Sequence, residues 1–189
     1  MTSLPLLAET IKGCTACPLH RAYKGPVPPR WGPGVPRVMV VGEAPGELED
    51  KQGAPFVGRS GIMLAEWLSA AGVEGAFITN VVKCRPPDND DPKRPWLESC
   101  AHHLTAELIA VAPRLIVCVG RFAGNAVLVQ KKAMGALFAL NATASTVVSG
   151  REVPVVSIYH PASFMYGNRA VTIETNVEAI RLGLRRAAL

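Results

Sequence analysis

Four apolar runs divide the chain, and each ends at a polar or glycine-containing turn. Their length and their β-branched residues predict buried strands. The segments between them carry helix signals: Ser60 precedes the segment Gly61–Ala71 and Gly72 follows it, and Pro95 begins a helix expected to reach about Val111. The expected strands are Val38–Val41, Gly75–Lys83, Leu115–Val119 and Val153–Tyr159.

Three further helices complete the pattern. A short amphipathic helix is expected before Cys14, another starts at Arg121, and a final helix with a basic end covers about Thr175–Ala187. The stretch Ala133–Gly150 is too weakly patterned to predict an element. The alternation of strands and helices predicts an α/β fold of three layers, α/β/α, around a central, mostly parallel four-stranded sheet. We expect residues 1–189 to form a single domain.

The composition limits the class of protein. Of the 189 residues 49% are apolar, which is enough for a full core and too many for a disordered segment. No apolar run approaches a membrane span, and the N-terminus lacks the features of a signal peptide, so we expect a cytoplasmic protein without a membrane partner. The net charge of +5 suits a polyanion such as nucleic acid, although a solvated surface explains it equally well.

Polar side chains stand at or near the carboxyl ends of three predicted strands. Glu43 follows the first strand, Asn80 lies near the end of the second, and His160 follows the last. In an open parallel sheet, ligands bind just beyond these strand ends, so we expect the three side chains to form one site. Phe56 lies in a glycine-rich loop and either packs into the core, the commoner outcome, or faces a flat ligand.

These residue types favour one kind of chemistry. A carboxylate can hold or activate water, and an imidazole can stabilise charge on a leaving group. An amide has both a donor and an acceptor, which suits the edge of a nucleobase. The sequence contains no phosphate-binding Walker loop, no GxGxxG fingerprint and no GxSxG elbow.

The five cysteines raise the question of a metal site, because disulfides are disfavoured in a reducing compartment. Cys14 and Cys17 form a CxxC pair, Cys84 follows a strand, and Cys100 lies in a predicted helix. A zinc ribbon normally has a second CxxC pair, and four thiolates are also the usual ligands of a [4Fe–4S] cluster. Spacing alone leaves zinc and iron–sulfur both open. Cys118 lies in an apolar strand and is expected in the core.

Five segments carry a resemblance to a known family. GEAPGELED, APFVGRSG, TNVVKCRPP, ESC and YHPA occur in this order. Together they resemble the motifs of family 4 uracil-DNA glycosylases, the prokaryotic iron–sulfur members of the uracil-DNA glycosylase superfamily. The resemblance spans roughly residues 14–162. It implies a uracil-DNA glycosylase-like fold and the hydrolytic release of free uracil from single- or double-stranded DNA, which leaves an abasic site.

The resemblance also implies roles for individual residues. Glu43 would position the attacking water, and His160 would donate to uracil O2 and stabilise the departing uracil anion. Asn80 would recognise the polar edge of uracil, and Phe56 would stack on its ring. The backbone that shapes the pocket would be that of Gly42, Ala44, Pro45 and Gly46. The [4Fe–4S] ligands would be Cys14, Cys17, Cys84 and Cys100.

The sequence departs from the family pattern at two places. After His160-Pro161, relatives commonly have a leucine-rich tip that wedges into the duplex. Here Phe164 or Met165 could serve as the wedge, or could pack against the body of the protein. The stretch Ala133–Gly150 also differs from the expected pattern and could alter the pocket rim.

The sequence also allows other functions. A related group traps DNA covalently through a basic insertion after its GRxG loop, and Gly58–Gly61 here continues without such an insertion, which favours a hydrolase. One alternative is a non-catalytic Fe–S or zinc protein that binds nucleic acid. Another is a glycosylase with a shifted base preference, such as hypoxanthine or xanthine. A monomer is the expected oligomeric state.

Overall fold

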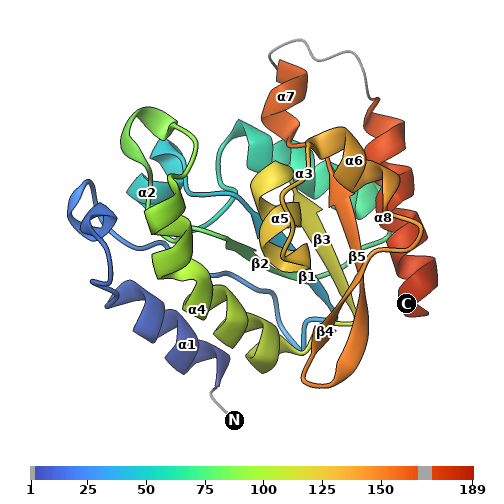
Figure 1. The fold of residues 1–189 in the computed structure, drawn as a ribbon, viewed down its shortest axis with the longest axis horizontal. Coiled ribbons are helices and arrows are strands. Elements are labelled where there is room, and N and C mark those ends of the chain that lie inside the picture. The colour runs from blue at the N-terminus through green and yellow to red at the C-terminus, as the bar shows by residue number, and fades with distance from the viewer. Residues whose placement is uncertain (1–2, 166–171) are drawn as a thin grey trace.

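The computed structural model describes residues 3–165 and 172–189, the side chain of Met165 excepted. Among these residues the chain forms a five-stranded sheet with helices on both faces (Figure 1). The strand order is β2-β1-β3-β5-β4. The strands are β1 (Val38–Gly42), β2 (Ala76–Asn80), β3 (Leu115–Val119), β4 (Ser145–Val148) and β5 (Arg151–Ile158).

Four of the five strands, β2, β1, β3 and β5, run parallel, as the sequence predicts. β1 lies between β2 and β3, and β3 lies between β1 and β5. The chain therefore winds outward from β1 to β2 in one direction and from β3 to β5 in the other. The carboxyl ends of β1 and β3 flank the point where the winding reverses, and ligands bind at such a switch point in open α/β sheets.

The fifth strand, β4, corrects the expectation of four strands. It pairs antiparallel with β5, in a register that places Val148 opposite Arg151. Ser149 and Gly150 form the tight turn between them, with φ values of 49° and 78°. Two such left-handed residues give the turn that suits the twist of a hairpin. β4 lies at the edge of the sheet and half of it is open to solvent, which explains why its apolar pattern is weak.

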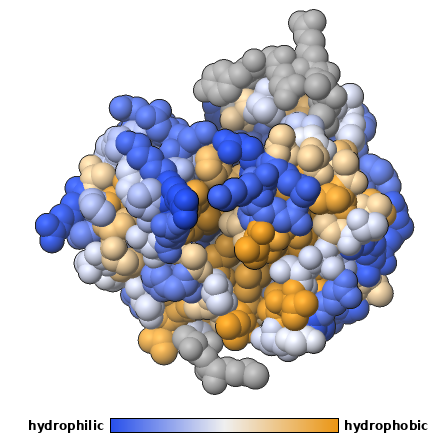
Figure 2. Space-filling model, in the orientation of Figure 1, coloured by the Kyte–Doolittle hydropathy of each residue, from blue (hydrophilic) through white to orange (hydrophobic). Residues whose placement is uncertain are grey.

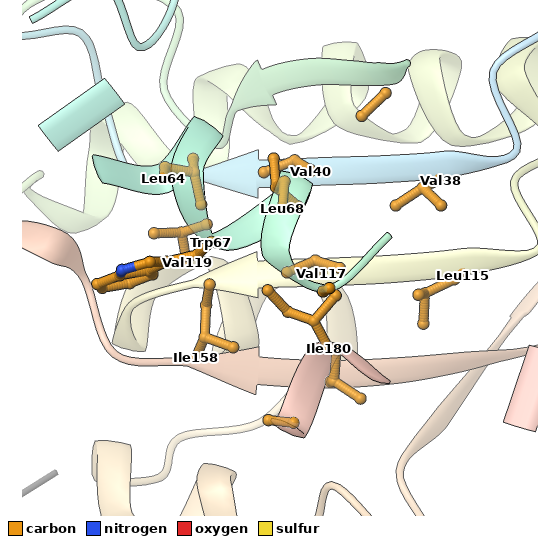
Figure 3. Close-up of a cluster of buried hydrophobic side chains, with 14 of the residues drawn as sticks. Val38, Val40, Leu64, Trp67, Leu68, Leu115, Val117, Val119, Ile158 and Ile180 are labelled. Atoms are coloured by element: carbon orange, nitrogen blue, oxygen red, sulfur yellow. The ribbon is translucent and has the colours of Figure 1, made fainter. Parts of the chain in front are cut away.

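One face of the sheet is covered by α3 (Arg59–Ala70), α7 (Pro161–Met165) and α8 (Ile173–Ala187). Figure 3 shows side chains of α3, including Trp67, lying over residues of β1 and β3 such as Val40 and Val119. Ile180 of α8 packs in the same cluster. The fully buried strand residues face helices on both sides, which is why these strands lack polar alternation.

The other face is covered by α4 (Arg94–Val111) and α5 (Arg121–Leu128), and α1 (Leu4–Lys12) packs against α4. Figure 2 shows this side of the molecule, where apolar residues gather in the lower half of the view and hydrophilic ones in the upper left. The short elements are α2 (Glu47–Gln52), α6 (Met134–Ala139) and the 3-10 turns η1 (Pro18–Arg21) and η2 (Pro87–Asn89).

Element ends differ from the sequence prediction in two instructive places. The second strand ends at Asn80 and not at Lys83, because the chain turns there and the Lys83 ammonium binds the Asn80 carbonyl. The helix expected from Gly61 begins at Arg59, and Gly58 is its N-cap, so Ser60 lies within the first turn. None of the described helices is long and apolar enough to cross a membrane.

Candidate functional site

A cavity of about 710 Å³ lies at the carboxyl ends of the strands. It receives side chains from three strand ends and from the loop between α2 and α3. The structure thus brings together Glu43, Asn80, His160 and Phe56, as the sequence analysis predicts. Further lining residues come from the Ala44–Glu49 segment, Gly58–Ser60, Pro86, Asn89, Asp90 and Ala162.

Glu43 is the first residue after β1 and is partly shielded from solvent. The pKa of its carboxyl group is raised to about 7, mainly by burial and also by the nearby Asp91 carboxylate, while the Arg121 guanidinium opposes the shift. Burial acts in this direction because it penalises the charged form of an acid. A carboxyl group with a pKa near the working pH is suited to accepting a proton from water or to orienting it.

Asn80 is the last residue of β2 and is only 5% exposed. Its side chain lies against Gly42, the residue paired with it on β1. A Cβ atom on Gly42 would lie 2.3 Å from Asn80 Oδ1 and 2.5 Å from the Phe56 ring. Only glycine fits between these two groups, so Gly42 sets how deeply both can lie beneath a ligand.

Phe56 has an unusual backbone for its residue type. Its φ of 54° is in the left-handed region, and a Cβ atom on Gly61 would lie 2.0 Å from its carbonyl oxygen. Strained conformations of this kind persist where the surrounding structure fixes them. Phe56 is 8% exposed and yet lines the cavity. It therefore both packs in the core and faces the space for a ligand, the two positions that the sequence analysis left open.

Glu49 organises the loop that carries Phe56. Its Oε1 accepts hydrogen bonds from the backbone N–H groups of Val57 and Gly58 at 3.0 and 2.9 Å, and its Oε2 accepts one from Gly46 at 3.2 Å. Glu49 therefore caps the start of α2 and also ties α2 to the loop across the cavity wall. The neighbouring Asp50 is buried and accepts a hydrogen bond from the Lys24 N–H.

His160 faces the cavity from the chain after β5. Its Nδ1 accepts a hydrogen bond from the Ala162 N–H at 3.2 Å, so in the neutral ring the proton belongs to Nε2. Burial lowers the pKa of this imidazole, and the Glu49 carboxylate partly opposes the shift. The ring is tilted 30° to that of Phe56, with 6.2 Å between centroids. The site therefore presents a neutral N–H donor beside an aromatic face.

The cysteines of the predicted ligand set converge from three segments. Cys84 and Cys100 are buried in a small apolar cluster, and Cys17 packs against it. The pKa of the Cys84 thiol is raised to about 12, mainly by burial and also by the nearby Cys100, Cys17 and Cys14. Cys118 is fully buried in β3, away from this group, as expected of a core residue.

The four thiols have the chemistry of a ligand set for zinc or for an iron–sulfur cluster. Thiols that raise one another's pKa in an apolar surrounding become thiolates only beside a positively charged group, and metals provide one. In the described part of the chain, no three His, Cys, Asp or Glu side chains are close enough to hold a single metal ion.

The two wedge candidates have different outcomes. The ring of Phe164 packs edge-on against Trp67 at 5.3 Å between centroids and is partly buried. This contact supports the packing role that the sequence analysis left open. The side chain of Met165 lies outside the described residues. Residues 133–150, expected near the rim, contribute nothing to the described cavity lining.

Sequence reasoning missed several cavity residues, among them Asn89 and Asp90. These two belong to the turn after Pro86-Pro87, and Asn89 adopts a left-handed φ of 58°. The Pro-Pro-Asp-Asn string predicts a turn. Its position over the cavity depends on how the segment after β2 folds back, and no local signal encodes that.

Comparison with known proteins gives consistent matches. A sequence model of the Uracil DNA glycosylase superfamily matches residues 29–181. The Type-4 uracil-DNA glycosylase of Archaeoglobus fulgidus is 39% identical over 177 residues, which cover 88% of this chain and 85% of the relative. That of Pyrobaculum aerophilum is 40% identical, over 86% of this chain and 84% of the relative. That of Sulfurisphaera tokodaii is 36% identical, over 96% and 84%.

Proposed function

The chain belongs to the uracil DNA glycosylase superfamily, and from this membership we propose that it is a DNA repair enzyme that hydrolyses the bond between uracil and deoxyribose. The products are free uracil and an abasic site. The observation that carries the proposal is the convergence of Glu43, Asn80 and His160 from three strand ends on one cavity. A base inside a duplex is out of reach of such a cavity, so the uracil must be flipped out.

Recognition of the base follows from the cavity walls. Phe56 offers an aromatic face, and the buried Asn80 amide offers a donor and an acceptor to the C=O and N–H of uracil. Cytosine has an amino group where uracil has a carbonyl, so the same amide would be mismatched. Sites that hydrogen-bond a ligand edge discriminate strongly because a mismatch leaves buried polar groups unpaired.

Bond cleavage follows from the two titratable groups. As the glycosidic bond breaks, positive charge develops on the sugar and negative charge on uracil. The Nε2–H of His160 donates to uracil O2 and stabilises that anion without first losing a proton. The Glu43 carboxylate orients the attacking water and its charge stabilises the sugar cation. Water then adds to the sugar carbon, its proton passes to Glu43, and uracil leaves with the electrons of the broken bond.

The cysteines complete the proposal. Cys14, Cys17, Cys84 and Cys100 would hold a [4Fe–4S] cluster, which would staple the N-terminal segment to the segment after β2 and to α4 within one domain. The cluster supplies a structural cross-link when bound. The same proposal places the enzyme in the cytoplasm, where thiols stay reduced, and has it act as a monomer on DNA.

The first experiment measures release of free uracil from a uracil-containing single-stranded oligonucleotide. Multiple turnover is expected for the wild type, with strong losses in His160→Ala and Asn80→Ala. Binding without release would favour a nucleic-acid-binding protein on the same fold. Faster release from hypoxanthine- or xanthine-containing strands would assign a different base preference.

A second experiment tests the cysteine site. The purified protein is expected to be brown, with iron and sulfide in equal amounts, and Cys84→Ser should be colourless. A colourless wild type with stoichiometric zinc would overturn the cluster. Cys118→Ser is the matched control, because this cysteine lies in the sheet and not among the four. It should retain the colour.

A further inference from the structure

A buried ion pair lies next to the main chain of Asn80, the residue proposed to recognise the base. Lys83 and Glu107 are 1% and 0% exposed, and Lys83 Nζ lies 2.7 Å from Glu107 Oε2. Among the residues that the structure describes, no other ion pair has both side chains buried. Lys83 stands three residues after Asn80, and Glu107 projects from α4.

The Lys83 ammonium uses all three of its protons within the protein. Besides Glu107 it donates to Thr79 Oγ1 at 2.8 Å and to the carbonyl oxygen of Asn80 at 2.6 Å. Thr79 Oγ1 in turn donates to the second oxygen of Glu107 at 2.8 Å. The network is closed, with the Asn80 main chain as one of its members.

The same segment is tied to the other parts of the site. Beyond Asn80, the N–H groups of Val81 and Val82 donate to the carbonyls of Gly42 and Glu43, both at 2.9 Å. The Lys83 carbonyl accepts from the Val27 N–H at 2.7 Å. Cys84, a member of the proposed ligand set, follows Lys83 directly in the chain. The turn that Lys83 holds therefore connects the base-reading amide, the carbonyl of Glu43 and one cysteine of the proposed ligand set.

Stability alone does not account for such a pair. Desolvation of two charges offsets most of their attraction, and replacing a buried ion pair with uncharged groups of similar volume is often neutral or stabilising. The hydrogen bonds of the pair contribute to the positioning of Asn80. They fix the carbonyl of Asn80 on one side, while Gly42 confines its side chain on the other.

We propose that Lys83, held by Glu107 and Thr79, is a positioning residue that fixes the Asn80 amide at the angle required to read the flipped base. This inference rests on the proposed function, because it assigns Asn80 to base recognition. Misplacement of a recognition group by about 1 Å can cost on the order of 100-fold in rate. The pair therefore acts on the chemical step through Asn80 and leaves binding of the DNA strand unchanged.

The test is a mutant cycle. The pair variant, Lys83→Met with Glu107→Gln, removes both charges and so leaves neither unpaired. Its single-turnover rate of uracil release is expected to fall about 10- to 100-fold, with unchanged affinity for the oligonucleotide. In an Asn80→Ala background the same change should have less than about a twofold effect, because the group being positioned is gone.

Matched controls separate positioning from general damage. Arg185→Met with Glu178→Gln removes an exposed pair of similar distance on α8 and should leave the rate unchanged. Equal visible absorption of the pair variant and the wild type would show that the cysteine site is intact. If the pair variant does not fold, Thr79→Val keeps the volume and removes the bridging hydroxyl. The decrease in the rate of uracil release caused by Thr79→Val should likewise vanish in the Asn80→Ala background.

The outcomes are distinct. A wild-type rate in the folded pair variant, or in Thr79→Val where only that variant folds, overturns the inference. An equally large loss with and without Asn80 also overturns it, because the pair would then act elsewhere. Absence of uracil release by the wild type would instead refute the proposed function.

Discussion

The two ends of the sheet are both hollowed, and they differ in what lines the hollow. The cavity at the carboxyl ends measures about 710 Å³ and that at the amino ends about 470 Å³. The second is lined by loop residues such as Gly32, Val35 and Gly75 and by Leu189 at the chain end. Its charged residues, Arg37 and Glu74, are both exposed.

The difference lies in solvent access to the polar groups and not in size. At the carboxyl ends, burial shifts the pKa of both Glu43 and His160, and the Asn80 amide is buried at the cavity wall. At the amino ends, neither Arg37 nor Glu74 is held away from water. Polar groups withdrawn from water interact more strongly with a ligand, and this favours chemistry at the carboxyl ends only.

The largest contrast is expected from matched carboxyl-to-amide changes. Glu43→Gln should lower the single-turnover rate of uracil release by about 10²- to 10⁴-fold, because an amide cannot accept a proton from water. Glu74→Gln, at the opposite hollow, should leave the rate unchanged. Equal rates in wild type and Glu43→Gln would remove Glu43 from the mechanism.

The pH dependence of the rate of uracil release also distinguishes Glu43 from Glu74. The pKa of Glu43 is raised to about 7, so its active carboxylate form is lost as the pH falls below that value. The rate should therefore rise with pH through about 7 and level off above it. Glu43→Gln should abolish this rise of the rate with pH, and Glu74→Gln should retain it. Single-turnover assays at a series of pH values measure both.

The next largest effect is expected from the hydrogen-bonding groups. Removing one preorganised donor from a site of this kind costs about 10²- to 10³-fold in rate. We expect losses of this order for His160→Ala and for Asn80→Ala. Arg37→Ala is the control at the other hollow, and a comparable loss there would contradict the assignment of the site.

A smaller effect is expected from adding a single methyl group. Gly42→Ala would place its Cβ 2.3 Å from Asn80 Oδ1, so the amide must shift and the rate should fall about 100-fold. A Cβ atom on Gly32 would have its nearest neighbour at 4.0 Å, so Gly32→Ala should leave the rate unchanged. Thermal unfolding of both variants distinguishes a displaced amide from a general loss of stability.

The smallest effect concerns the rim. Phe164→Ala removes an aromatic pair with Trp67 and the burial of part of its ring, and should lower the free energy of unfolding by about 1 to 3 kcal/mol. Activity on single- and double-stranded uracil DNA should then change in parallel. A selective loss on duplex DNA would restore Phe164 as the wedge. Phe138→Ala, which removes the pair with Tyr159, is the stability control.

The sequence allowed the sheet and the main site residues to be predicted, for a physical reason. Buried parallel strands are apolar on both faces and end at polar turns, so Glu43 and His160 are visible as the first polar residues after apolar runs. Asn80 is visible as an amide inside such a run. The common edge of a parallel sheet then brings the three together without further information.

The features that escaped prediction depend on contacts between distant segments. β4 has little apolar alternation because it is a half-exposed edge strand. Glu49 lies in the first turn of α2, yet two of its three hydrogen bonds cross to the loop at Val57 and Gly58. Lys83 looked like the end of a strand, and its role depends on Glu107, 24 residues away.

The strand order also has a consequence for the birth of the protein on the ribosome. Glu43 and Asn80 emerge early, and His160 follows β5, the last strand of the sheet to be made. Until β5 arrives, β3 has only one neighbour and the cavity lacks one wall. A nascent chain that has folded only its first two strands therefore lacks this wall, and the four side chains can come together only after β5 and His160 have been made.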